Sequence, residues 1–317
     1  MATALTLNRK SGLSPKTTVG VLLGGTSSER KISLRSGRAV LRAFKSAGIR
    51  TLALDPADKK KFQKRLAKID VAFFALHGTG GEDGLMQKRL QKAGVPFTGS
   101  DAAASRNAFD KVRAKKIFIR AGVPTPPYCV AGPHDWLNKL KRLGLPAFAK
   151  PVADGSSVGA FPIDDLTQSR KKIVQELRQF GRLLIERKIE GREFTVGILG
   201  NQALPVIELV PGREFFDYKA KYTPGVTRYD VPAKIPAPLA KRLKQIALRA
   251  HKALKLRDLS RVDLMQHADG RIEVLEANSI PGMTEMSLLP KAARAAGVSF
   301  EAFCVWLVSR ALKRKGQ

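Results

Sequence analysis

The sequence is poor in cysteine and in long apolar runs. Its 317 residues include two cysteines, Cys129 and Cys304, whose spacing is not that of a zinc or redox motif, which excludes a disulfide-rich scaffold. No stretch approaches the roughly 18 uninterrupted apolar residues of a transmembrane helix. Residues 1–18 are polar and basic, without the apolar core of a secretory signal. We therefore expect a reduced, cytoplasmic chain with no membrane partner.

Acidic residues are also scarce, with 27 Asp and Glu against 57 Lys and Arg and a net charge of +30. Such a charge attracts polyanions, so nucleic acids, nucleotides and acidic metabolites are all candidate partners. The basic residues are spread out, however, and pairs such as Lys115-Lys116 lie in segments with helical apolar spacing, where a solvated outer face is the simplest interpretation. No aromatic-interleaved basic stripe or helix-turn-helix spacing occurs, so we expect no specific nucleic-acid binding.

The first hundred residues alternate between strand and helix patterns. Residues 18–23 form a continuous apolar run, as a buried parallel strand does, and a helical pattern follows from about 30 to 47. Further strands are predicted at 50–54 and 70–76, with a Lys-rich helix between them. This alternation predicts a doubly wound parallel sheet, on which ligands bind beyond the carboxyl ends of the strands. The loops at those ends are residues 24–30 and 77–84.

A second unit begins near Ala102, and its pattern differs. Helices come first, and from Phe194 onward strands dominate until the C-terminal helices. The predicted helices are 110–121, 135–143 and 239–256, with two more at the end, and the predicted strands include 146–150, 182–186, 260–265 and 271–275. The chain therefore divides into three parts.

Near the C-terminal end, Glu276 and Asn278 stand two residues apart on a predicted strand, so both side chains point to one face. An Asp269-Gly270 pair predicts a two-residue hairpin turn before this strand, and the hairpin brings Asp263 toward Glu276. Carboxylate and amide oxygens suit Mg²⁺, which also holds substrate phosphates. The alternative is a half-buried hairpin that carries acidic residues on its wet face.

A loop rich in small residues, 154–159, follows the strand that ends at Lys150-Pro151. Successive N–H groups of such a loop can cradle phosphate oxygens, and Lys150 adds a positive charge. The Gly-Lys-Ser/Thr ending of a Walker A loop is missing. A flexible surface hairpin is an equally good interpretation of this segment taken alone.

Several other polar residues sit at strand ends. Glu186 and Glu193 flank a short linker, where they are suited to hydrogen-bond an adenine amino group and ribose hydroxyls, or are solvated charges. His77 ends an apolar strand and is as consistent with a structural loop residue as with a ligand. Glu29 is placed either for ligand binding or to support the first turn of the next helix.

In combination, these segments resemble the D-alanine–D-alanine ligases of the ATP-grasp superfamily along nearly the whole chain. Nine segments in the same order are far more specific than any one of them. They are 22–34, 75–84, 97–100, 110–111, 150–159, 186–199, 217–222, 261–263 and 275–288.

The resemblance implies an α/β fold, α+β in the C-terminal part: an ATP-grasp fold with an N-terminal doubly wound parallel-sheet domain. The implied division is an N-terminal substrate-side domain at 1–103, a central ATP-grasp subdomain at 104–188 and a C-terminal catalytic subdomain at 189–317. A lid loop is implied at about 212–228. A homodimer is implied by the family alone.

The implied activity is an ADP-forming carbon–nitrogen ligation. ATP phosphorylates the carboxylate of one D-alanine, the amine of a second attacks the acyl phosphate, and the dipeptide enters peptidoglycan synthesis. Two Mg²⁺ ions, with Mn²⁺ as an alternative, would be held by Asp263, Glu276 and Asn278. The implied ATP-binding residues are Lys111 and Lys150 at the phosphates, Ser157 in the loop above them, Glu186 with the backbone of Lys188 and Ile189 at the adenine, Glu193 at the ribose, and Lys221.

The implied substrate residues lie at both ends of the chain. Glu29 would anchor the first ammonium group, with His77 near the carboxylate, and Ser156 and Tyr222 would close the site. Arg261 and the Gly282 N–H would stabilise the tetrahedral oxyanion. Losing one such hydrogen-bond donor typically lowers the rate on the order of 10²–10³-fold. Ser287 and the Leu288 N–H would hold the second carboxylate.

Two alternatives stay open. A relative with another second substrate, such as D-lactate, is the nearer one, although Tyr222 within Lys219-Ala220-Lys221-Tyr222 favours the dipeptide. A basic nucleic-acid-associated protein on an ATP-grasp scaffold is the other. It predicts loss of metal ligands or phosphate lysines, and all of these are present.

Overall fold

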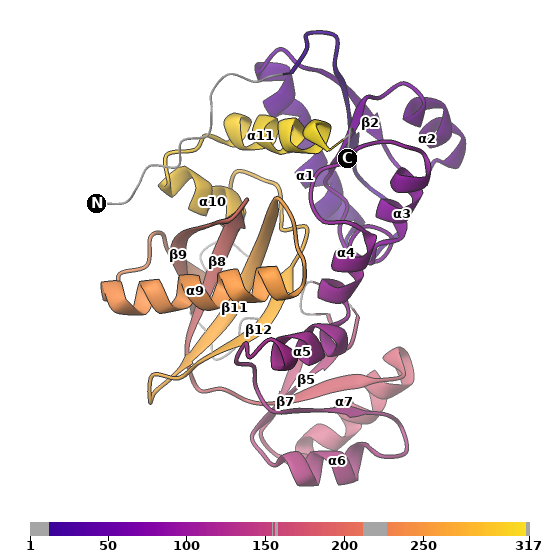
Figure 1. Ribbon diagram of the computed structural model, residues 1–317. Helices are drawn as coiled ribbons and strands as arrows, with labels where there is room; N and C mark the ends of the chain where they lie inside the picture. Colours follow the sequence, from indigo (N-terminus) through magenta and orange to yellow (C-terminus); the bar gives the residue numbers. More distant parts are fainter. Residues whose placement is uncertain (1–12, 154, 156–157, 212–226, 315–317) are drawn as a thin grey trace.

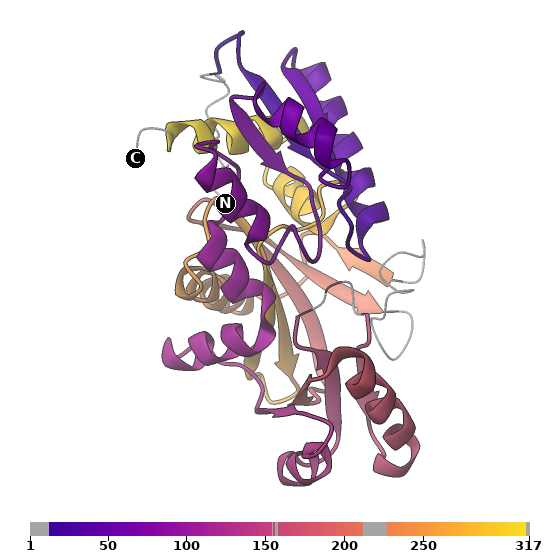
Figure 2. The same ribbon diagram turned by 90° about the vertical axis from the view of Figure 1, so that its right-hand side faces the viewer.

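The computed structural model describes residues 13–153, 155, 158–211 and 227–314. Three β-sheets follow one another from top to bottom of an elongated molecule (Figures 1 and 2). The first sheet is parallel and the other two are antiparallel. The predicted α/β N-terminal part with an α+β remainder is therefore confirmed.

The parallel sheet has the strand order β2-β1-β3, and both of its faces are covered. Because both faces are buried, successive strand residues are apolar, which explains the continuous run at 18–23. Gly37 lets the first helix approach the sheet, since a Cβ there would lie 2.4 Å from the Cβ of Leu23. The elements are β1 (Thr18–Leu22), α1 (Arg30–Ser46), β2 (Arg50–Leu54), α2 (Lys59–Leu66), β3 (Val71–Phe74) and α3 (Leu85–Lys92).

The order of these strands fixes where a ligand can bind. β1 pairs in parallel with β3, although β2 lies between them in the sequence. The connections after β1 and β3 therefore leave the sheet at a topological switch point, and the two loops begin side by side at one edge. These are the loops 24–30 and 77–84 that the sequence predicts as ligand loops.

The second sheet, at the bottom of Figure 1, has the order β4-β7-β5-β6. Two helices, α6 (Trp136–Leu143) and α7 (Leu166–Phe180), cover one face of this sheet and pack on alternate strand residues such as Ala149 and Ile185. The residues between them, Lys150 and Glu186, point to the opposite face because side chains alternate along a strand. The elements are β4 (Tyr128–Ala131), α6 (Trp136–Leu143), β5 (Ala147–Pro151), β6 (Phe161–Ile163), α7 (Leu166–Phe180) and β7 (Leu183–Arg187).

The third sheet, in the middle of the molecule, has the order β10-β9-β8-β11-β12. A long helix lies across one face and packs on Phe194, Val262 and Leu264. This helix, α9, runs over Ala237–Ala253, so it begins after Pro236 and ends three residues before the predicted end at 256. The strands are β8 (Gly191–Leu199), β9 (Gln202–Pro211), β10 (Thr227–Asp230), β11 (Leu259–His267) and β12 (Ile272–Asn278).

The predicted hairpin between β11 and β12 forms, but its turn is not the two-residue turn that the sequence suggests. The N–H of His267 donates to the carbonyl of Arg271 (2.9 Å), and the N–H of Gly270 donates to the carbonyl of His267 (3.0 Å). Three residues, 268–270, therefore form the loop. Gly270 adopts φ +84°, as the last residue of a three-residue hairpin loop does.

The described residues contain four further helices: α4 (Ala102–Phe109) and α5 (Lys111–Arg120) between the first two sheets, and α10 (Leu288–Ala295) and α11 (Phe300–Lys313) after the last strand. Asp110 ends α4 and caps α5, because its carboxylate accepts the N–H of Arg113 at 3.0 Å. α11 packs against α1, so the last helix belongs to the core of the first sheet. In the described part of the chain, no single helix could span a membrane, and α10 with α11 would pass by composition only as a pair bent by 103°.

Asp258 joins these parts through one buried carboxylate. It is 2% exposed and accepts two hydrogen bonds from Arg314 (2.8 and 2.7 Å), at the end of α11, and one from the N–H of Gly99 (3.0 Å). Its backbone carbonyl accepts the N–H of Gly200, between β8 and β9 (2.7 Å). One residue therefore ties α11, the segment before α4 and the five-stranded sheet together.

We predict that Asp258→Asn destabilises the protein on the order of 3 kcal/mol, because it leaves the guanidinium of Arg314 without its buried counter-charge. Urea unfolding measures this loss. Asp269→Asn is the matched control, since Asp269 pairs with Arg271 on the exposed surface and should shift the midpoint little. Equal midpoints for the two variants would contradict a structural role for Asp258.

Candidate active site between the two antiparallel sheets

The β11–β12 hairpin presents a row of polar side chains on one face. Asp263 lies directly opposite Glu276, and Arg261 lies opposite Asn278. Thr195 on β8 lies on the other side of Asp263. The predicted approach of Asp263 to Glu276 is therefore confirmed. The opposite face of the same strands is apolar and lies under α9.

Every candidate metal ligand in this row has a protein partner. Asp263 accepts two hydrogen bonds from Arg261 (2.9 and 2.7 Å) and one from the hydroxyl of Thr195 (2.6 Å). The amide oxygen of Asn278 accepts the N–H of Ile280 (2.9 Å). Glu276 lies 3.8 Å from Lys111 Nζ. Protein contacts therefore hold these oxygens in place, two of them within the sheet or the adjoining loop and one from Lys111 on α5.

The donor set fits a hard cation. Two carboxylates and one amide oxygen occupy neighbouring positions on a single hairpin, and Mg²⁺ prefers oxygen ligands of this kind. Among the described residues there is no group of three His, Cys, Asp or Glu that could hold a metal ion. An ion at this hairpin would therefore draw its remaining ligands from water or substrate oxygens.

The four-stranded sheet contributes a buried cluster of charges. Glu186 on β7 is 2% exposed and pairs with two lysines, Lys150 on β5 through Oε2 and Lys115 on α5 through Oε1. Lys111, one helical turn before Lys115, reaches Glu276 on the other sheet. Lysines on α5 thus link the two sheets, because Lys115 contacts a carboxylate of the four-stranded sheet and Lys111 contacts one of the five-stranded sheet.

Burial and mutual charge set the protonation of this cluster. Burial alone would lower the pKa of Lys150, but the carboxylates of Glu186, Glu276 and Asp263 raise it above the usual value. Burial opposes ionisation of Glu186 too, yet its two lysine neighbours hold its pKa below the usual range. Both groups are therefore charged at neutral pH.

The predicted adenine and ribose residues lie at the β7–β8 end of this region. The N–H of Lys188 donates to the carbonyl of Pro146 (3.1 Å) and its side chain pairs with Asp164 (2.7 Å), so a contact with a base would fall to its carbonyl oxygen. Ile189 follows in the same linker. Glu193 on β8 lies opposite Met265, two positions along from Asp263 and on the same face.

The parallel sheet supplies a third group of polar residues. Ser36 on α1 is fully buried, and its hydroxyl lies 3.1 Å from Nε2 of His77 and accepts the N–H of Met283 (3.2 Å). Nδ1 of His77 lies 3.8 Å from Glu82. Both ring nitrogens of His77 thus face protein groups, and Ser36 joins the histidine to the loop after β12.

Glu29 is 8% exposed and lies where two loops converge. A Cβ added to Gly78 would lie 2.9 Å from its Oε2, and a Cβ added to Gly155 would lie 2.4 Å from the same atom. Glu29 is the N-terminal cap residue of α1, but its side chain makes no capping hydrogen bond. Its carboxylate is therefore placed for contacts in this corner rather than for capping.

The loop after β12 ends at the start of α10. Ser287 occupies the N-cap position of α10 without a side-chain capping hydrogen bond, and its hydroxyl instead accepts the N–H of Thr284 (3.1 Å). A Cβ at Gly282 would lie 2.8 Å from Ser287 Oγ, so the glycine permits this tight loop. The N-terminus of α10 carries a partial positive charge, which favours an anion beside Leu288.

The remaining predicted residues, Ser156, Ser157, Lys221 and Tyr222, lie outside the described residues, as does the predicted lid except for Thr227 and Arg228. Lys115, Ser36 and Glu82 were not predicted as site residues from the sequence. The prediction that Lys115 lies on a solvated face is wrong, because this side chain is 1% exposed. The spacing of four residues from Lys111 was the available signal, since it places both lysines on one helix face.

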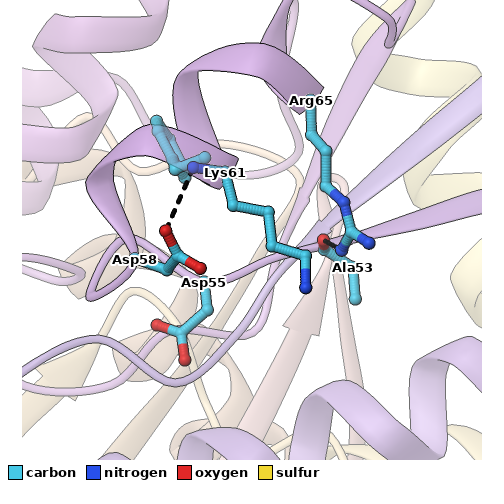
Figure 3. A pocket seen from close by; sticks show the side chains of 6 residues that line it. Ala53, Asp55, Asp58, Lys61 and Arg65 are labelled. Carbon is cyan, nitrogen blue, oxygen red and sulfur yellow. Dashed lines mark hydrogen bonds between the residues drawn. The ribbon is translucent and has the colours of Figure 1, made fainter.

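A separate cavity of 210 Å³ lies between β2 and α2 (Figure 3). Its polar groups serve the local fold: Asp58 accepts the N–H of Lys61 (3.0 Å), and Arg65 donates to the carbonyl of Ala53 (2.6 Å). None of the predicted site residues lines it.

Comparison with known proteins gives consistent matches. The family model described as the D-ala D-ala ligase C-terminus matches residues 117–309, and that of the N-terminus matches 50–100. A D-alanine–D-alanine ligase from Aromatoleum aromaticum is 43% identical over 92% of this chain and 95% of its own length.

Solved structures of D-alanine–D-alanine ligases also match this chain. The D-alanine–D-alanine ligase from Bacillus anthracis has a TM-score of 0.86 and 33% identity, covering 95% of this chain and 99% of its own. The same enzyme complexed with ATP has a TM-score of 0.84 and 32% identity, covering 96% and 99%.

Proposed function

Because the chain belongs to the D-alanine–D-alanine ligase family, we propose that the polar surfaces of its two antiparallel sheets bind ATP between them and direct its phosphate to D-alanine. The activity of the chain is the ATP-dependent joining of two D-alanine molecules, which supplies the dipeptide for peptidoglycan. Two observations carry the proposal for the site: Lys111 lies 3.8 Å from Glu276 of the β11–β12 hairpin, and the charges of Glu276 and Asp263 help to raise the pKa of Lys150, which pairs with Glu186.

The reaction needs two group transfers. A carboxylate oxygen of the first D-alanine attacks the γ-phosphorus of ATP, and ADP leaves. The uncharged amine of the second D-alanine then attacks the acyl carbon, phosphate leaves with the bonding electrons, and the amine loses a proton. Positioning and charge stabilisation are the main demands on the protein in phosphoryl transfer.

Lys111 and Lys150 would position the phosphates of ATP. Lys111 and Lys150 each contact a carboxylate in the protein, and the phosphates of ATP would replace or share those contacts. Glu186 would accept a hydrogen bond from the adenine amino group, with the Lys188 carbonyl and Ile189 N–H beside it, and Glu193 would take the ribose. Ser157 and Lys221, outside the described residues, would complete the nucleotide site.

Asp263, Glu276 and Asn278 would hold Mg²⁺, two ions being the expected number. When bound, the ions neutralise charge on the transferred phosphoryl group. Arg261 now pairs with Asp263. With Asp263 engaged as a metal ligand, the Arg261 guanidinium would be available to the developing oxyanion, with the Gly282 N–H as the second donor.

The amino-acid substrates would lie between the hairpin and the parallel sheet. Glu29 would bind the ammonium of the first D-alanine, and His77, held by Ser36 and Glu82, would lie near its carboxylate. The N-terminus of α10 at Ser287 and Leu288 would bind the second carboxylate. Ser156 and Tyr222, outside the described residues, would close the site.

Other expectations stay proposals. We propose that the protein is cytoplasmic, which agrees with its need for ATP, and that it forms a homodimer, as the family leads us to expect. The domain boundaries at 103/104 and 188/189 stay predictions. Five relatives that are 40–43% identical to this chain are named as D-alanine–D-alanine ligases, so neither D-lactate as second substrate nor a nucleic-acid role is favoured.

The direct experiment is coupled ADP release with ATP, Mg²⁺ and D-alanine, with product analysis by mass spectrometry. D-alanine-dependent ADP release with formation of D-alanyl-D-alanine is the expected result. No D-alanine-dependent turnover would overturn the proposal. Preference for D-lactate over D-alanine as second substrate would replace it with depsipeptide synthesis.

We predict that Glu276→Gln lowers turnover at least about 100-fold, because it removes a charge from the metal site while keeping the shape of the side chain. The same coupled assay measures this. Glu301→Gln, in the first turn of α11, is the matched control and should keep wild-type turnover. A Glu276→Gln enzyme with near-native activity would show that the metal assignment is wrong.

We predict that Gly155→Ala lowers kcat/KM for D-alanine on the order of 10²-fold, because the added Cβ would displace the carboxylate of Glu29. Gly132→Ala is the control: the nearest atom there is 3.7 Å away, so activity should persist. Both variants should melt near the wild-type temperature. Equal activity of the two would indicate that Glu29 does not need its observed position.

A further inference from the structure

Lys115 is a buried cation that the mechanism above leaves without a role. It lies on α5 one turn after Lys111, so both side chains leave the same face of the helix. Lys111 reaches Glu276, whereas Lys115 reaches Glu186 and is 1% exposed. The two lysines therefore serve different ends of the site.

Three groups fix the Lys115 ammonium. It pairs with Oε1 of Glu186, donates a 2.6 Å hydrogen bond to the hydroxyl of Thr125, and lies 6.0 Å from the ring centre of Tyr128. The Thr125 hydroxyl donates in turn to the carbonyl of Val274 on β12 (2.8 Å). Lys115 is thus anchored to both sheets, and it cannot move without disturbing Glu186.

A charge at this position is unfavourable for stability alone. Burial lowers the pKa of Lys115 to about 8, although the charge of Glu186 opposes the shift. Replacing a whole buried ion pair by apolar side chains is often neutral or stabilising, whereas removing one member leaves the other charge without its partner. The ammonium is therefore better explained by what it does to Glu186 than by packing.

Glu186 divides its two oxygens between two lysines. Oε1 faces Lys115 and Oε2 faces Lys150. If Lys150 turns to a nucleotide phosphate, Oε2 loses its partner and becomes the oxygen available to a base. Lys115 then stays as the cation that keeps the carboxylate ionised and oriented.

We propose that Lys115 is a positioning residue for nucleotide selection: it holds Oε1 of Glu186 so that Oε2 accepts the 6-amino group of adenine. This inference rests on the proposed function, since it takes ATP as the nucleotide and Glu186 as its base contact. An anionic acceptor at that point favours a 6-amino purine and repels the 6-oxo group of hypoxanthine or guanine.

The test compares three nucleotides: ATP, inosine triphosphate with its 6-oxo group, and purine riboside triphosphate, which carries only hydrogen at position 6. Lys115→Met should raise KM for ATP about 10- to 100-fold, the usual loss for a hydrogen bond to a charged group. KM for purine riboside triphosphate should stay nearly unchanged, and kcat should change little. Discrimination against inosine triphosphate should shrink.

The neighbouring residue gives a matched control. Lys116 is exposed, so Lys116→Met makes the same chemical change without touching Glu186 and should keep the wild-type nucleotide preference. Lys115→Arg retains the charge and should restore part of the preference. If Lys115→Met does not fold, Thr125→Val removes the anchor of the ammonium and should shift the preference in the same direction by less.

An equal rise in KM for all three nucleotides would show that Lys115 is only structural and would overturn the inference, as would no change at all. Wild-type enzyme that turns over but uses ATP and purine riboside triphosphate equally well would also overturn it, while leaving the ligase activity standing. Wild-type enzyme with no D-alanine-dependent turnover on any nucleotide would instead sink the proposed function.

Discussion

The ion cluster around Glu186 is the interaction on which the site depends. It lies where the inner faces of the two antiparallel sheets meet, and its lysines come from a helix and a strand that are distant in sequence. Each charge is buried, so each is tolerable only because its partners are present. The cluster therefore holds α5, β5 and β7 in one arrangement, and Lys111 on the same helix carries that arrangement over to Glu276.

The two sheets reach this arrangement because each has one apolar and one polar face. α9 covers the apolar face of the five-stranded sheet, and α6 and α7 cover that of the four-stranded sheet. Burial of those faces supplies the stability, and the remaining faces are left to carry charge. Asp258 adds the third part by fixing α11 and the segment before α4 to the five-stranded sheet, and Ser36 joins His77 to the loop after β12.

Much of this could be predicted from local pattern. The spacing of Glu276 and Asn278, and a hairpin returning from Asp263, are properties of adjacent strands, and the register confirms them. The parallel sheet is predicted by apolar strand segments that alternate with helical segments. The errors fall where local pattern carries too little information: the hairpin loop has three residues rather than two, and α9 ends at Ala253 although its apolar spacing continues.

Lys115 shows most clearly what local sequence pattern cannot predict. In the sequence it is half of a basic pair on an amphipathic helix, and its neighbour Lys116 is indeed exposed. The sequence by itself determined the elements, the polar hairpin face and the family, because these depend on residue order and on neighbours along the chain. Only the tertiary structure decided which of two adjacent lysines is buried, because Glu186 and Thr125 come from separate segments that meet at Lys115 only in the folded chain.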